Sequence, residues 1–218
     1  MKFYVIDYVA KSKGESGESC KSTYDLNGSC EHCGTPLNLI APLITKGLSK
    51  INCDFFATLD GDFLISEELY RFLSDKGRVQ GLRKVVDSRK REIPYYHLYA
   101  ELNFPKSLPM SEGLVTEDQC PVCKRNGYFC DAKIGDYKKG IPTVITPLKL
   151  MYKGISPDFL ESSDLFHTWE HLGISNLKAE GIKVIRYARP MLIVSEKIKT
   201  AFEEYGVKDS KFEEVIIN

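Results

Sequence analysis

Two Cys-x-x-Cys pairs constrain this chain more than any other feature: Cys30 and Cys33 in CEHCG, and Cys120 and Cys123 in CPVC. A Cys-x-x-Cys turn brings two thiolates to one metal, and two such turns complete the tetrahedral set of four sulfurs that structural zinc prefers. Such a site leaves no coordination position open for chemistry. We therefore predict one structural Zn²⁺ ion. Either the ion joins two segments far apart in the sequence, or the two pairs belong to a zinc ribbon into which the core of the protein is inserted.

The other three cysteines leave alternatives open. Cys20 and Cys130 flank the two pairs, so either could replace one of the four ligands. Cys53 precedes an apolar stretch and is expected to be a small buried hydrophobe. The odd total of seven argues against a disulfide framework. Thioredoxin-type redox chemistry is disfavoured because neither pair starts a helix after a strand.

Composition and charge exclude several classes of protein. The chain is 43% hydrophobic and 11% aromatic, which is enough to bury a core and is not a disordered composition. Thirty basic residues balance thirty acidic ones, whereas a dedicated nucleic-acid-binding domain usually carries a positive excess. The opening MKFYVIDYV is interrupted by Asp7 and does not resemble a signal peptide. We expect a cytoplasmic protein with no membrane partner.

Strand and helix signals alternate along the chain and predict an α+β fold. We expect a mixed sheet with few helices, two β-helix-β units and a zinc-ribbon-like pair of Cys-x-x-Cys knuckles. The expected domain is the whole of 1–218, with a zinc-ribbon-like subdomain built from about 18–36 and 116–132. Strands are predicted over residues 2–9, 54–65 with a turn at 60–62, 82–86, 95–104, 191–194 and 212–217.

Two segments resemble each other without gaps. FLISEELYRFLSDKG at 63–77 aligns on LIVSEKIKTAFEEYG at 192–206. A duplication explains this match, but so does the general physics of a strand followed by a Ser N-cap, an amphipathic helix and a C-terminal Gly. Both explanations predict that Ser66 and Ser195 cap helices and do not catalyse.

Two further motifs suggest other functions. His167, Glu170 and His171 fit the H-x-x-E-H pattern of a zinc hydrolase if they lie on a helix, although Gly173 would cut that helix short. The alternative is an amphipathic segment with a half-buried Trp169. The basic stretch 81–91 suggests a zinc-ribbon protein that binds nucleic acid, but the run is short and charge clusters are usually solvated.

In outline the chain resembles the double-CxxCG-motif family, which includes immunity proteins paired with bacterial polymorphic toxins. The matching features are MKFYVID, CEHCG, CPVCKRNG, SDLFHTWEHLG and the ending RPMLIVSEKIKTAFEEYGVKDSKFEEVII. The second motif departs from the family pattern, because Lys124 stands where Gly is expected. The resemblance implies a non-enzymatic protein with a cognate protein toxin as its partner and the two cysteine pairs as zinc ligands.

Overall fold

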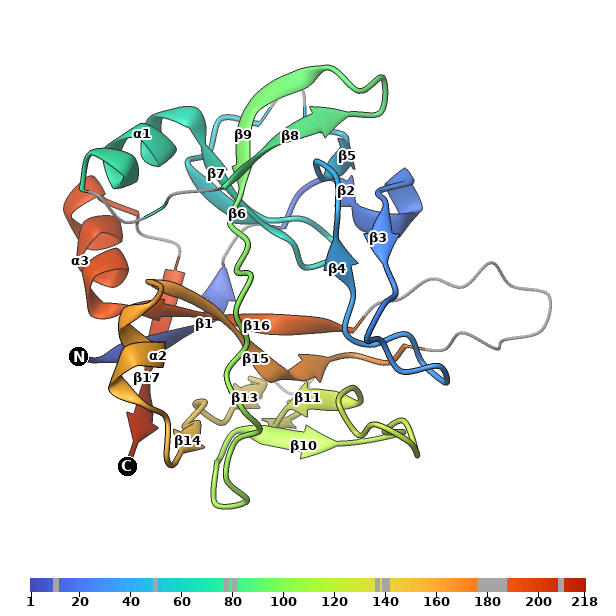
Figure 1. The fold of residues 1–218 in the computed structure, drawn as a ribbon, viewed down its shortest axis with the longest axis vertical. Helices are drawn as coiled ribbons and strands as arrows, with labels where there is room; N and C mark the ends of the chain where they lie inside the picture. Colours follow the sequence, from blue (N-terminus) through green and yellow to red (C-terminus); the bar gives the residue numbers. More distant parts are fainter. Residues whose placement is uncertain are drawn as a thin grey trace.

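A computed structural model describes most of the chain. The described residues are 1–9, 12–48, 51–76, 79, 82–135, 138, 142–175, 188–207 and 210–218. They form two larger sheets, several two-stranded hairpins and few helices (Figure 1). Both larger sheets mix parallel and antiparallel pairs, so the prediction of mixed sheets with few helices is confirmed.

The first sheet has five strands. Their order is β14 (Met151–Tyr152), β17 (Ser210–Ile217), β1 (Phe3–Val9), β16 (Arg189–Ser195) and β15 (Leu165–Leu172). Only the pair β14–β17 is parallel among the pairs within this sheet. This sheet forms the lower half of the view in Figure 1.

The second sheet has six strands. Their order is β2 (Glu15–Ser16), β5 (Ile44–Lys46), β8 (Arg83–Asp87), β9 (Glu92–His97), β7 (Phe63–Ser66) and β6 (Phe55–Ala57). The pair β5–β8 is parallel and the others are antiparallel. Separate hairpins are formed by β3 (Tyr24–Asp25) with β4 (Asn38–Leu39), β10 (Leu114–Thr116) with β11 (Tyr128–Cys130), and β12 (Ala132–Lys133) with β13 (Val144–Ile145).

Helices α1 (Glu67–Asp75) and α3 (Glu196–Tyr205) lie side by side at one end of both sheets (Figure 1). Two short helices, η1 (Gly17–Cys20) and α2 (Pro157–Glu161), lie elsewhere. α1 starts as predicted, because the Ser66 hydroxyl accepts a hydrogen bond from Leu69 N at 3.1 Å. Ser195 also occupies an N-cap position, but its hydroxyl makes no capping bond. The prediction for Ser195 is therefore only half right.

The predicted end of each helix has a different outcome. Gly206 ends α3 with φ 90°, a left-handed conformation that costs glycine little. Gly77, the corresponding prediction for α1, lies outside the described residues. The strand predicted over 95–104 is wrong beyond His97, because the chain leaves the second sheet there and crosses to β15, where Asn103 bridges His167.

The two larger sheets repeat one arrangement. In the first, β15–β16–β1–β17–β14 have the same order and relative directions as β6–β7–β9–β8–β5 in the second. The residue register agrees as well. Tyr4 on β1 pairs with Val194 and Glu214, while Tyr96 on β9 pairs with Ile65 and Lys84. The gapless sequence alignment places Ile65 on Val194, so sequence and strand register match.

The buried residues follow the same repeat. One core holds four equivalent pairs together: Phe55 and Leu165, Ile65 and Val194, Leu69 and Ile198, Leu73 and Phe202. Other equivalent pairs are divided between two further cores. One core contains Phe56, Leu64, Val85 and Tyr95, and the other contains their counterparts in the same order, Phe166, Ile193, Val215 and Phe3. Capping physics alone does not produce this agreement, so the structure favours duplication.

The two units exchange their first strands. The elements of the two units correspond in chain order. The first unit contains β1, the β3–β4 hairpin, β5, β6, β7, α1 and β8. The second contains their counterparts in the same order: β9, the β10–β11 hairpin, β14, β15, β16, α3 and β17. However, β1 lies between β16 and β17 of the second unit, and β9 lies between β7 and β8 of the first. Each unit therefore completes the sheet of the other.

Candidate metal centre

The first cysteine pair lies in the loop of the β3–β4 hairpin. Gly34 N donates to the carbonyl of Cys30 at 2.6 Å, and Cys30 N donates to Thr35 O at 3.0 Å. Gly34 has φ 73°, a left-handed conformation that a residue without Cβ adopts at little cost. The sequence CEHCG thus closes a tight turn that points both thiols to one side.

The second pair lies in the corresponding loop of the β10–β11 hairpin. Lys124 N donates to the carbonyl of Cys120 at 3.1 Å, so Lys124 takes the place of Gly34. Its φ is 59°, in the same left-handed region, although it carries a side chain. The departure from the CxxCG pattern therefore changes the strain at this position and leaves the turn intact.

Two neighbouring residues hold the second turn. The side-chain oxygen of Asn126 accepts a hydrogen bond from Cys120 N at 2.9 Å, and its amide donates to Ser175 O at 3.1 Å. Gly127 has φ 76°, and a Cβ there would lie 2.4 Å from Glu117 O. The extension of β15 also braces the turn, since His171 N donates to Arg125 O at 2.7 Å.

The four thiols meet where the two hairpins face each other. Cys30 Sγ lies 3.8 Å from Cys120 Sγ, and Cys33 Sγ lies 3.5 Å from Cys123 Sγ. All four sulfurs lie within 4.8 Å of one another. A tetrahedron with Zn–S bonds of about 2.3 Å has sulfurs about 3.8 Å apart, so the set has the dimensions that zinc requires. The prediction that the two pairs come together is confirmed; the identity of the metal remains a prediction.

The other cysteines stay outside this cluster. Among the described residues, the four named sulfurs are the one set of three or more His, Cys, Asp or Glu ligand atoms this close together. Cys20 is buried beside the hydroxyl of Ser19, and the Cys53 thiol donates to Phe55 O at 3.1 Å. Cys53 is half-buried, less enclosed than predicted.

Electrostatics in the cluster favour a cation among the sulfurs. Burial alone would raise the pKa of Cys120, but the backbone N–H groups of Cys123 and Val122 lower it to about 7. Burial and the neighbouring Cys33 raise the pKa of Cys123 to about 12, and burial raises that of Cys33. Thiolates this close together repel one another, so the group does not ionise as a whole without a compensating charge. A bound cation removes that conflict, because it neutralises the sulfurs together.

The hydrolase alternative required His167, Glu170 and His171 on one helix face, and this expectation is wrong. The three residues lie on strand β15. His167 Nε2 lies 3.5 Å from Ala100 N, its hydrogen-bond donor, and His171 Nδ1 lies 3.0 Å from Trp169 O. Glu170 Oε1 accepts from Ser107 N at 2.8 Å. The three side chains have separate partners and do not form a common ligand set.

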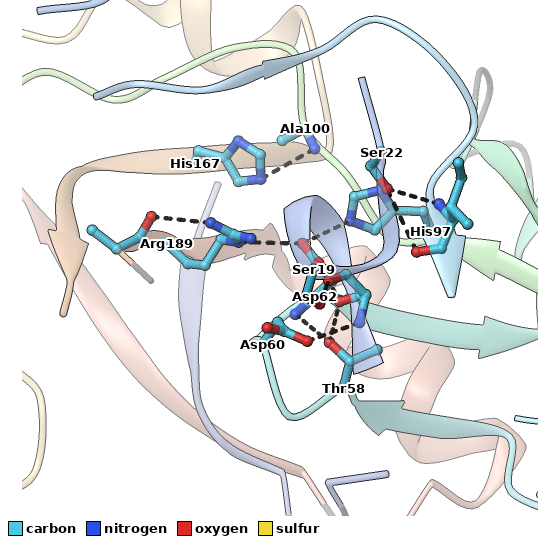
Figure 2. A network of polar contacts seen from close by, with 12 residues as sticks. Ser19, Ser22, Thr58, Asp60, Asp62, His97, Ala100, His167 and Arg189 are labelled. Atoms are coloured by element: carbon cyan, nitrogen blue, oxygen red, sulfur yellow. Dashed lines mark hydrogen bonds and ion pairs between the residues drawn. The ribbon is translucent and has the colours of Figure 1, made fainter. Parts of the chain in front are cut away.

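A buried polar network that the sequence did not reveal lies between the two sheets (Figure 2). Asp62 Oδ1 is 3.6 Å from both His97 Nε2 and Arg189 Nε, and Asp62 Oδ2 accepts a hydrogen bond from Ser16 Oγ at 2.5 Å. Burial lowers the pKa of His97 despite the neighbouring Asp62. These residues come from four distant segments, so no motif spacing signals them.

This network borders a cavity of about 50 Å³ lined by both units, with Phe63 and Leu192 at equivalent positions. A cavity of that size holds a few water molecules. Asp62 of the first unit contacts His97 and Arg189 of the second, so the network joins the two units. It does not present the nucleophile–base order of a hydrolytic triad, because Asp62 lies between Ser16 and His97.

Comparisons of this chain with models of known protein families, with curated proteins and with solved structures find no match. Among the described residues, no helix is both long and apolar enough to cross a membrane.

Proposed function

We propose that this chain is a zinc-stabilised, non-enzymatic immunity protein that neutralises a cognate bacterial toxin by direct binding. The observation that supports it most is the joining of Cys30, Cys33, Cys120 and Cys123, the residues that carry the resemblance to the double-CxxCG-motif family. A closed set of four sulfurs is a structural zinc site. The zinc then holds the two hairpins together, and the protein acts through its surface.

The decisive experiment is coexpression with any toxin candidate that is found encoded beside this gene. Cells that express both proteins are expected to survive, and cells that express the toxin alone are expected to die. The purified proteins should also form a complex in size-exclusion chromatography. Continued killing in the presence of well-expressed, folded protein would overturn the proposal.

Metal content tests the zinc site separately. Elemental analysis should find about one zinc per chain in the wild type, none in the Cys30→Ser/Cys120→Ser double variant, and an unchanged amount in the control Cys53→Ser. Zinc retained in the double variant, or absent from the wild type, would show that these four sulfurs are not the site.

The nucleic-acid alternative receives less support from the structure. Within the basic stretch, Arg91 pairs with Asp87 at 2.6 Å, Lys84 with Glu92 at 3.2 Å, and Arg83 approaches Glu101 at 3.9 Å. Cations already neutralised by carboxylates contribute little to phosphate binding. This surface therefore resembles a solvated face.

A further inference from the structure

The single tryptophan of the chain, Trp169, lies in an irregular part of strand β15. The register between β15 and β16 shifts between His167 and His171, which marks a β-bulge. The equivalent pair β6–β7 keeps a regular register from Phe55 to Ala57. β6 ends at Ala57, the counterpart of His167, so the irregular part of β15 extends beyond the strand pair that the two units share. Bulges of this kind re-aim side chains. Trp169 is left half-buried at the surface.

Two cations lie against the Trp169 ring. Lys106 Nζ is 5.1 Å and Arg125 Cζ is 5.4 Å from the ring centroid. Arg125 Nε also lies 3.4 Å from Trp169 O, which accepts its hydrogen bond. Arg125 comes shortly after the second Cys-x-x-Cys turn in the sequence. A zinc ion held by that turn would therefore also fix the backbone of Arg125.

Neither cation forms an ion pair with a carboxylate within 4.0 Å in the described part of the chain, although Glu170 lies near enough to Arg125 to raise its pKa against the effect of burial. Elsewhere, cations at aromatic rings are paired: Lys199 lies 5.2 Å from the Tyr4 ring and also pairs with Glu203 at 2.6 Å. The Trp169 face therefore presents the exposed Lys106 ammonium to an outside anion, with the half-buried Arg125 guanidinium beside it. Val122 lies in the second Cys-x-x-Cys turn, close to Arg125 in the sequence, and 69% of its surface is accessible to solvent.

We propose that Trp169, Lys106 and Arg125 form a docking face for an acidic segment of a protein partner. This inference rests on the proposed function and names the surface through which a toxin would bind. Trp and Arg dominate the binding energy of protein interfaces, and opposite charges across an interface set orientation and association rate. A nucleic acid is disfavoured, because two cations on a chain of zero net charge form no phosphate-binding stripe.

Because Trp169 is the only tryptophan, its fluorescence reports on this face directly. Titration with an oligoglutamate peptide at low ionic strength should change the emission saturably, and added salt should weaken the change. Oligoglutamine of the same length should have no effect. Lys106→Gln, at an exposed position, should weaken binding about fivefold. The control Lys199→Gln should bind like the wild type.

The absence of any saturable response to oligoglutamate would overturn the inference. So would equal binding by Lys106→Gln and the wild type, or a response to a single-stranded RNA oligonucleotide without one to oligoglutamate. The last result would identify the face as a phosphate site.

The toxin experiment separates this inference from the proposed function. If the wild type binds the candidate toxin and Lys106→Glu loses about tenfold or more in affinity while Lys199→Glu does not, both stand. If Lys106→Glu binds the toxin as tightly as the wild type, the face is wrong and the immunity function remains. If the wild type does not bind the toxin while the peptide titration succeeds, the proposed function is wrong and the docking face for an acidic segment remains.

Discussion

At the scale of single residues, the two knuckles reach the same backbone conformation with different side chains. Gly34 has φ 73° and Lys124 has φ 59° at equivalent positions. The left-handed region costs a residue with a Cβ about 1–2 kcal/mol. The second knuckle therefore carries strain that the first avoids.

Lys124→Gly should relieve this strain. Part of the gain is lost because glycine is freer in the unfolded chain, which leaves a stabilisation of up to about 1 kcal/mol. Gly127→Ala should destabilise by more than about 1 kcal/mol, because its Cβ would lie 2.4 Å from Glu117 O. Urea unfolding at saturating zinc measures both. A destabilised Lys124→Gly would show that the lysine side chain has a further role.

The two N-cap serines should respond differently to alanine. Ser66 accepts from Leu69 N and donates to Asp54 Oδ1 at 2.7 Å, so Ser66→Ala should cost about 1 kcal/mol or more. The Ser195 hydroxyl is buried and has no hydrogen-bond partner. Its removal should change the free energy of unfolding by no more than a few tenths of a kcal/mol. Equal losses in both variants would contradict this difference.

At the scale of elements, β15 carries two histidines that burial keeps neutral. Burial lowers the pKa of His167 and that of His171 to about 3. Their ordinary pKa near 6.5 applies to the unfolded chain, which therefore binds more protons than the folded chain as the pH falls. The contribution of these two neutral histidines to the free energy of unfolding is fully present above pH 6.5. It is lost progressively between about pH 6.5 and pH 3.

The slope of stability against pH should therefore decrease when one histidine is removed. Each proton taken up on unfolding contributes about 1.4 kcal/mol per pH unit. His171→Gln should lower the slope between about pH 6 and pH 4 by up to that amount. Urea midpoints over this range measure the slope, and the comparison between variants cancels the acid sensitivity of the metal site. An unchanged slope would show that His171 is already protonated in the folded protein.

At the scale of the whole molecule, the exchange of β1 and β9 ties the two units together. Each first strand lies in the middle of the other unit's sheet, and the four sulfurs come in pairs from the two units. Separation of the units requires both sheets to open and the four-cysteine cluster to come apart. The connection between β8 and β9, by contrast, is an exposed turn at residues 88–90.

Cutting that turn should not separate the halves. With a protease recognition sequence inserted between Arg89 and Lys90, the two fragments of the cleaved protein should stay together in size-exclusion chromatography with zinc present. Chelation should weaken the complex, because the proposed zinc would be held by sulfurs of both fragments. Fragments that separate under native conditions would rule out the exchanged arrangement as the main link between the units.

The local features of this protein could be predicted from short stretches of the amino-acid sequence. The Cys-x-x-Cys spacing fixes two tight turns, Ser66 starts a helix, and Gly206 ends one, because these signals act within a few residues. The tertiary structure decided which segments meet. The sequence did not reveal that β1 lies in the sheet of the second unit, that β15 is a strand with a bulge, or that Asp62, His97 and Arg189 share a cavity. These features depend on contacts between residues far apart in the chain. The free energy of such contacts depends on how the surfaces pack, and it leaves no periodic pattern in the sequence.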